Sequence, residues 1–267
     1  ALVVFSEVNI PVDEWRLPHK EHELSQALLR LQEARVITRS EPSGLPGQIE
    51  FAFTDPAERA EILRTLPPEE RALRHRAVAS WLRGLPADTR GRSLMFYAYH
   101  LEMGGRPELA ARSYLEVAAR QAAAGRPAEA VQLLERAAMA VVGEGVREVA
   151  DVHLARLLLL ARLGPLNQAV DAARRAVRGA LVTGDRTLGG RVFLGWAELD
   201  LLMAGMPAAA LRLDQARALL PPGDGNAGWG WLRRTESLFH LTRLDAGDIG
   251  RAITAIESVL RNAAALA

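Results

Sequence analysis

The chain has 267 residues, with 33 basic and 32 acidic side chains, 49% hydrophobic and 5% aromatic residues, and a formal net charge of +1. This composition excludes collagen-like and disordered classes, and the absence of cysteine excludes disulfides, thiol nucleophiles and thiolate metal sites. No apolar run reaches the ~18 residues needed to cross a bilayer and the N-terminus lacks signal-peptide features, so we expect a cytoplasmic chain without membrane contact.

The first third of the sequence mixes helix and strand patterns. Residues 22–36, HELSQALLRLQEARV, predict an amphipathic helix with one apolar face formed by Leu24, Ala27, Leu28, Leu31 and Ala34. VITRS, the turn residues EPSGLPG and the alternating QIEFAFT predict a β-hairpin with one face formed by Ile49, Phe51 and Phe53. Helices are expected from Pro56 to Leu66 and from Pro68 to Leu85. This order is typical of a winged helix, so we predict a small winged-helix domain with trailing linker helices over residues 1–90.

From Gly91 onward the strand pattern disappears, and helix-length segments separated by glycine turns follow one another. The turn glycines are Gly105, Gly125, Gly164, Gly205 and Gly247. After each turn, three residues at i, i+4 and i+7 form a stripe: Ala110/Tyr114/Val117, Ala130/Leu134/Ala137, Ala169/Ala173/Ala176, Ala209/Leu213/Ala216 and Ala252/Ile256/Val259. Glycine permits a tight turn, and a small first residue lets neighbouring helices approach closely. The pattern predicts a mostly α fold in which residues 91–267 form an α-solenoid of antiparallel helical hairpins.

The five stripes resemble the second-helix half of tetratricopeptide repeats, which have glycine at the turn, alanine five positions later, and a large then a small residue at +4 and +7. The first-helix half matches poorly, the period exceeds about 34 residues, and the turn at Gly205 is one residue shorter. In these departures the chain is similar to the degenerate repeats in the sensor arms of bacterial STAND signalling ATPases, including the maltose-regulon activator and the large LuxR-type regulators. Residues 51–82, FAFTDPAERAEILRTLPPEERALRHRAVASWL, resemble the winged-helix end and following helices of these proteins, with Asp55 where histidine often stands.

The resemblance implies a regulatory fragment that is not an enzyme. No Walker A pattern occurs in the sequence, and the chain begins without methionine and ends within a helical pattern, so an upstream ATPase core is expected outside it. A small-molecule effector or a protein partner on the concave face of the repeats would shift the equilibrium between two arrangements of arm and core. No cofactor is expected, because GDGNAG at residues 223–228 does not follow a strand, and His19 and His22 have no third ligand at a metal-binding spacing.

Candidate binding residues are aromatic and arginine side chains in the later repeats, where stacking and bidentate hydrogen bonds would suit a peptide, a sugar or an aromatic ligand. They are Arg191, Trp196, Trp229, Trp231, Arg233 and Arg234. The simpler interpretation is that the rings fill space between alanine-rich helices. Asp151, Arg156 and Arg162 complete the candidate set, although both of these arginines are expected to be solvated. The histidines at 75, 100, 153 and 240 are isolated in the sequence.

Two other functions stay open. A scaffolding solenoid would hold an extended peptide or a helix of another protein without a small-molecule ligand. A winged-helix DNA reader needs a basic face, but its candidate helix pairs three basic with three acidic residues and the hairpin tip SGLPG is uncharged. Direct DNA binding by this chain is therefore not expected.

Overall fold

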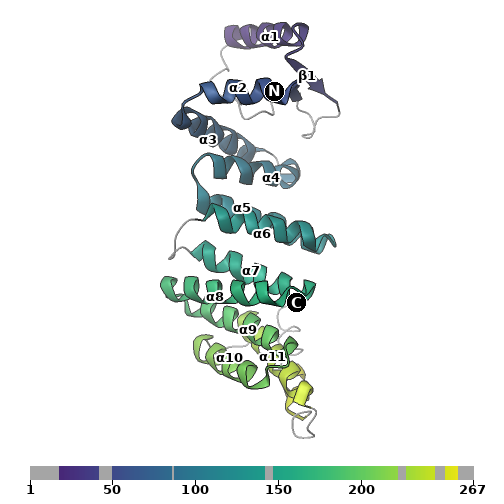
Figure 1. The fold of residues 1–267 in the computed structure, drawn as a ribbon, viewed down its shortest axis with the longest axis vertical. Helices are drawn as coiled ribbons and strands as arrows, with labels where there is room; N and C mark the ends of the chain where they lie inside the picture. The colour runs from purple at the N-terminus through teal and green to yellow at the C-terminus, as the bar shows by residue number, and fades with distance from the viewer. Residues whose placement is uncertain are drawn as a thin grey trace. The chain divides into compact units, whose positions relative to one another are not determined.

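The computed structural model describes residues 18–41, 50–85, 87–141, 147–221, 227–243 and 250–257. These residues are mostly helical, with a small two-stranded antiparallel sheet, which confirms the mostly α prediction (Figure 1). The chain divides into two compact units, Ala1–Val117 and Ala118–Ala267. Residue 90, the predicted domain boundary, lies inside helix α4 (Ala87–Met103). No helix in the described ranges is long and apolar enough to cross a membrane.

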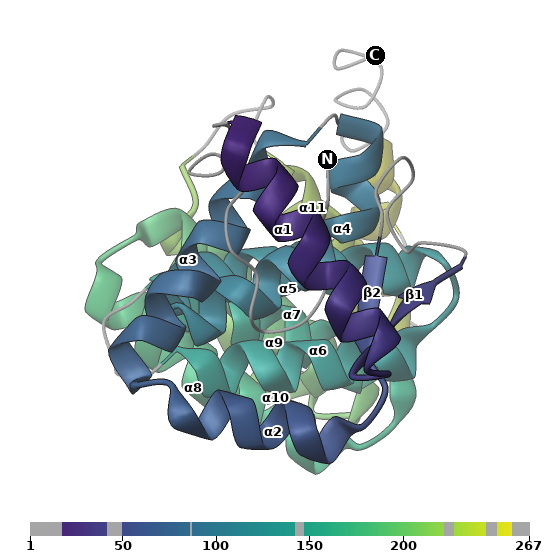
Figure 2. The same cartoon turned by 90° about the horizontal axis from the view of Figure 1, so that it is seen from above.

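The first unit starts with the predicted order of helix, hairpin and helices. Its elements before α4 are α1 (Pro18–Glu33), β1 (Ile37–Ser40), β2 (Glu50–Phe53), α2 (Pro56–Thr65) and α3 (Pro68–Gly84). The strands pair antiparallel with Ile37 opposite Phe53, which confirms the hairpin. Strand β1 packs beside α1 (Figure 2), and Leu28, Ile37 and Phe51 form a small core there. The hairpin tip and Ile49 lie outside the described residues.

Helix α1 differs from its prediction in its end and in its burial. It ends at Glu33 instead of residue 36, because Arg35 adopts a left-handed φ of 58° and the N–H of the next residue bonds back to the Leu31 carbonyl at 2.9 Å. Among the described side chains of the expected apolar face only Leu28 is buried. Leu31 is 40% exposed, and Ala27 and Ala34 are also exposed. The short strand β1 covers only a narrow stripe of the helix.

The remaining helices follow one another along the chain. They are α5 (Pro107–Ala123), which crosses the division between the units, and then α6 (Pro127–Ala140), α7 (Arg147–Leu163), α8 (Leu166–Thr183), α9 (Arg186–Leu202), α10 (Met206–Leu219) and α11 (Ala227–Arg243), with further helical residues at 250–257. In the second unit each helix from α6 to α10 packs against the next, and α9 also contacts α7 and α11. Because connections such as 164–165 and 184–185 are so short, consecutive packed helices run antiparallel.

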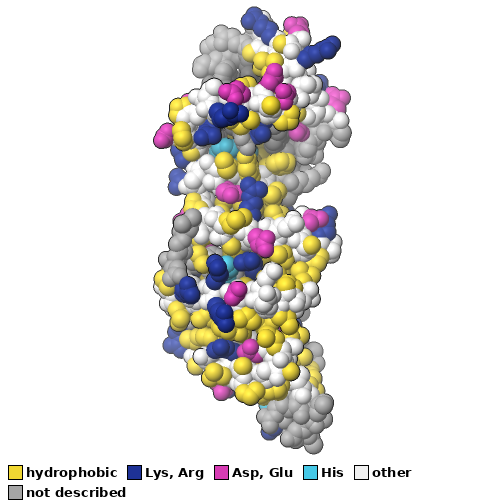
Figure 3. Space-filling model, viewed as in Figure 1, with side chains coloured by type: hydrophobic (Ala, Val, Ile, Leu, Met, Phe, Trp, Pro, Cys, Tyr) yellow, Lys and Arg dark blue, Asp and Glu magenta, His cyan; other side chains and the backbone are white. Residues whose placement is uncertain are grey.

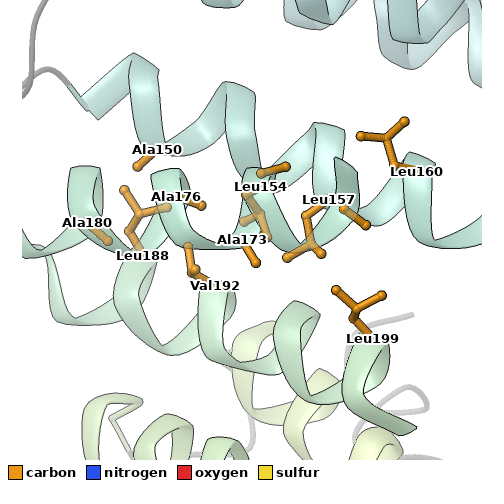
Figure 4. Packing of buried hydrophobic residues seen from close by; sticks show 12 residues of the cluster. Ala150, Leu154, Leu157, Leu160, Ala173, Ala176, Ala180, Leu188, Val192 and Leu199 are labelled. Atoms are coloured by element: carbon orange, nitrogen blue, oxygen red, sulfur yellow. The ribbon is translucent and has the colours of Figure 1, made fainter. Parts of the chain in front are cut away.

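A stripe of alanines on α8 sets the core of the second unit. Figure 4 shows Ala173 and Ala176 between side chains of α7 and α9, including Leu157 and Val192. At Gly179 an added Cβ would lie 3.1 Å from the backbone nitrogen of Ala150, so α7 and α8 approach too closely for a larger side chain. Small residues therefore fix the distance between these helices.

The predicted contact stripes are buried in four of the five cases. No member of the first four stripes is more than 7% exposed. In the fifth, Ala252 is buried but Ile256 is 41% exposed, and Ala255, at 7%, takes its place on the buried side. The prediction for Ile256 is therefore wrong, because the buried face there follows the spacing i, i+3. Val259 and Gly247 lie outside the described residues.

The fourth turn uses a different residue from the one expected. Gly105, Gly125 and Gly164 have φ of 70°, 76° and 102°, as a tight turn with a left-handed residue requires. At the fourth predicted turn the left-handed residue is Ala204, with φ 56°, whereas Gly205 has φ −85°. In each of these four turns the left-handed residue lies five positions before the buried alanine that begins the stripe. In the fourth turn the glycine stands one position later, so an alanine has to adopt the strained left-handed conformation.

Candidate functional site

A groove crosses the second unit where α6, α7 and α8 meet. Two adjoining cavities of about 560 Å³ and 420 Å³ form it, and both are lined by Ala138, His153, Asp171 and Arg175. The rest of the lining comes from Glu135, Met139, Val141, Val149, Arg156, Gln168, Arg174, Arg178 and Gly179. Small-molecule sites typically have volumes of roughly 300–1,000 Å³. We call this feature the α7 groove.

The sequence of α8 explains why one wall of the groove is basic. Asp171, Arg174, Arg175 and Arg178 recur at i, i+3, i+4 and i+7, which places them on one face of the helix. The buried alanines of the core occupy the opposite face. Figure 3 shows basic side chains gathered on the surface over α7 and α8.

His153 lines both cavities of the groove and makes no hydrogen bond with any described residue. It projects from α7, is only 4% exposed, and its buried Nδ1 has no partner. Burial first, and then the positive charges of Arg156 and Arg175, together lower the pKa of His153 to about 4. The imidazole is therefore neutral at pH 7, with one ring nitrogen able to donate and the other able to accept a hydrogen bond.

The arginines around His153 use only part of their hydrogen-bonding capacity. A guanidinium nitrogen of Arg156 lies 3.6 Å from Glu135, but its buried Nε has no partner. Arg174 lies 3.4 Å from Asp171 in an exposed pair. Arg175 makes no ion pair or hydrogen bond within the part of the chain that the structure describes. The groove thus presents donors that are available to a ligand.

The arrangement suits binding better than acid–base chemistry. A general base needs an orienting hydrogen bond and a partner that stabilises its protonated form. His153 has neither among the described residues, and its arginine neighbours oppose protonation. Across the same described residues, no three His, Cys, Asp or Glu side chains are grouped so as to hold a metal ion.

The structure separates the residues that the sequence singled out. Arg156 alone lines the α7 groove, and at 18% side-chain exposure it is mostly buried, so the expectation that it is solvated is wrong. Arg162 is exposed in the last turn of α7, as expected. Asp151 lies 3.6 Å from Arg147, and burial raises the pKa of Asp151 while Arg147 and then Arg191 oppose the rise.

The tryptophan and arginine set on α9 and α11 is engaged with the protein itself. Trp196, Trp229 and Trp231 are half-buried and pack against the hydrophobic core. The indole Nε1 of Trp231 donates to Glu198 at 2.7 Å, and Arg234 pairs with the same carboxylate. The guanidinium of Arg212 lies 4.1 Å from the centre of the Trp196 ring.

Arg233 completes this set in the same way. It lies 5.1 Å from the centre of the Trp229 ring and 3.0 Å from the buried Glu236. In these contacts the rings and charged groups fill the space between helices. The simpler interpretation of the sequence assigned the tryptophans this packing role.

Sequence reasoning missed the groove histidine and its basic wall. The available signal was the run of Asp171, Arg174, Arg175 and Arg178 on the face of α8 opposite the alanine stripe. It also treated His75 and His100 as isolated, whereas their Nδ1 atoms lie 2.9 Å apart in a buried contact between α3 and α4. Both cases depend on side chains from different helices.

The chain has no match among family models and none among curated proteins. Its structure is similar to the crystal structure of BtubC (BKLC) from P. vanneervenii, with a TM-score of 0.52 and 18% sequence identity over 79% of this chain and 86% of that chain. At this level of identity the similarity shows a shared fold, and function has to be argued from the site.

Proposed function

We propose that the chain is a non-enzymatic regulatory arm that binds an effector ligand or a protein partner in the α7 groove. The observation that carries the proposal is the buried imidazole of His153, which has no hydrogen-bond partner among the described residues although it lines a cavity. A buried polar group without a partner costs about 1–3 kcal/mol. A ligand that satisfies it would recover that free energy.

The order of elements supports a winged helix followed by a tetratricopeptide-like solenoid as the architecture of this arm. Helix, antiparallel hairpin and helix follow one another in the first unit. In the second unit, α7 to α10 are joined by short turns, and on α8 and α10 the residues five, nine and twelve positions after a left-handed residue are buried. This architecture is the one that the sequence resemblance to STAND-type regulators implies.

Such an arm would act by population shift. An effector in the groove binds one arrangement of arm and upstream ATPase core more tightly than the other, and the difference in affinity sets the size of the response. The chain supplies recognition, and the nucleotide chemistry belongs to the core.

Thermal unfolding of the chain in the presence of metabolites and of short peptides tests this proposal. A ligand at 100 times its Kd stabilises the folded state by about 2.7 kcal/mol, which raises Tm by several degrees for a protein of this size. Ala138 lines both cavities, so Ala138→Trp fills the groove and should abolish the shift. Ala208→Trp, on the exposed surface of α10, is the matched control and should preserve it.

The kind of ligand separates a sensor from a scaffold. Stabilisation by a small molecule supports the sensor, whereas stabilisation by peptides alone supports a scaffolding arm. A ligand that stabilises Ala138→Trp as strongly as the unsubstituted chain would show that the groove is not the binding site and would refute the proposal.

A further inference from the structure

The charge of the α7 groove specifies the charge of what it binds. Four arginines and two carboxylates line the two cavities, and His153 between them is neutral. The charged groups that line the cavities with His153 are Glu135 on α6, Arg156 on α7, and Asp171, Arg174, Arg175 and Arg178 on α8. The described charged side chains that line the two cavities therefore sum to +2, a charge that a single dianion would balance.

Donors in the groove come from two helices. The Nε of Arg156 and the ring of His153 lie on α7, and the guanidinium of Arg175, which has no partner among the described residues, lies on α8. Hydrogen bonds between guanidinium groups and oxyanions are short and about twice as strong as neutral ones. A tetrahedral group with three free oxygens can accept from donors on both helices at once, whereas a planar carboxylate has two oxygens.

We propose that the α7 groove binds the phosphoryl group of a small phosphate monoester through Arg175, Arg156 and His153. This inference rests on the proposed function, because it names the class of effector that the arm would recognise. The larger cavity, about 560 Å³, leaves space beside the phosphoryl group for the rest of a small molecule.

Phosphate binding should be coupled to protonation of His153. In the free protein, burial and the neighbouring arginines keep the imidazole neutral. A bound dianion offsets the arginine charges and stabilises the imidazolium, which then donates from both ring nitrogens. The bound imidazole takes up a proton as the pH falls from 7 toward 5, while the phosphate monoester itself protonates near pH 6. The affinity should therefore fall less over this range than it would if His153 could not be protonated.

Calorimetric titration of the chain with O-phosphoserine, inorganic phosphate and succinate tests the inference. We expect O-phosphoserine and inorganic phosphate to bind and succinate to bind at least tenfold more weakly. Arg175→Gln removes an exposed guanidinium without a described partner, so folding is preserved, and it should weaken phosphate binding by about tenfold or more. Arg126→Gln removes another exposed arginine, which lies outside the groove lining, and should leave binding unchanged.

The role of His153 has its own readout. His153→Gln should weaken phosphate binding at pH 7, and its affinity should fall more steeply than that of the unsubstituted chain as the pH falls from 7 toward 5. No binding of either phosphate, equal affinity for succinate, or an unchanged affinity in Arg175→Gln would overturn the inference. If a neutral metabolite or peptide instead stabilises the chain and Ala138→Trp blocks it, the proposed function stands and only the phosphate assignment fails.

Discussion

Replacing Ala204 by glycine should stabilise the protein, although alanine to glycine changes in helical proteins normally destabilise. Ala204 has φ 56°, and its N–H and that of Gly205 donate to the Leu201 and Asp200 carbonyls at 3.1 Å and 2.8 Å. The same pair of bonds closes the turns at Gly105 and Gly125, so Ala204 occupies a position suited to glycine.

The magnitude follows from two opposing terms. A left-handed conformation costs an L-residue about 1–2 kcal/mol, and glycine loses about 0.5–1 kcal/mol more backbone entropy than alanine on folding. The Ala204→Gly variant should therefore gain about 0.5–1 kcal/mol, which corresponds to a rise in Tm of roughly 1–4 °C.

Urea unfolding followed by circular dichroism measures this difference. Two variants serve as controls: Gly125→Ala, which introduces the strain, and Ala119→Gly, on an exposed position inside α5, should each lose about 1 kcal/mol. If Ala204→Gly loses as much stability as Ala119→Gly, the left-handed turn at Ala204 is incorrect and the register of the fourth turn must be revised.

Three further predictions concern packing, a buried hydrogen bond and pH. Gly190→Ala should lower the free energy of unfolding by about 1–3 kcal/mol, because its Cβ would lie 2.6 Å from a buried leucine side chain. Gly230→Ala, whose Cβ would have nothing within 4 Å, should raise the free energy of unfolding by up to about 1 kcal/mol. Equal effects of the two substitutions in urea unfolding would contradict this packing. Trp231→Phe removes the 2.7 Å hydrogen bond to Glu198 and should lower the free energy of unfolding by about 1.5 kcal/mol, and an unchanged value would show that the bond contributes nothing. The pKa of His153 falls from 6.5 to about 4 on folding, so the unfolded chain binds more protons, and the free energy of unfolding should decrease as the pH falls from 6.5 toward 4. His153→Gln should flatten that pH dependence. If the variant shows the same pH profile as the unsubstituted chain, the prediction is refuted.

The local elements were accessible from the sequence because their signals are local. Proline and acidic residues at the helix starts locate α2 and α3 to within one residue. Alternation of apolar residues and the turn composition locate β1 and β2. Alanines at fixed spacing identify the buried face of α8, because a helix places residues at i, i+4 and i+7 on one side.

The errors occurred where a neighbouring element decides the outcome. The periodicity of the sequence predicted a broad apolar face on α1. Among the described side chains of that face, only Leu28 is buried by neighbouring residues. The stripe beginning at Ala252 continues through Ala255 and not Ile256, since what is buried depends on the helix packed against it. Arg156 was expected in solvent and is covered by the adjoining helices.

The sequence by itself determined the helical segments, the hairpin and the alanine faces, because each is fixed by interactions within a few residues. The tertiary structure alone decided that His153, Arg156 and Arg175 from two antiparallel helices meet in one groove, and that the tryptophans of α9 and α11 are occupied by Glu198, Arg212 and the core. Side chains from separate helices become neighbours only through the packing angle and register of those helices, which the spacing of residues along one helix does not encode.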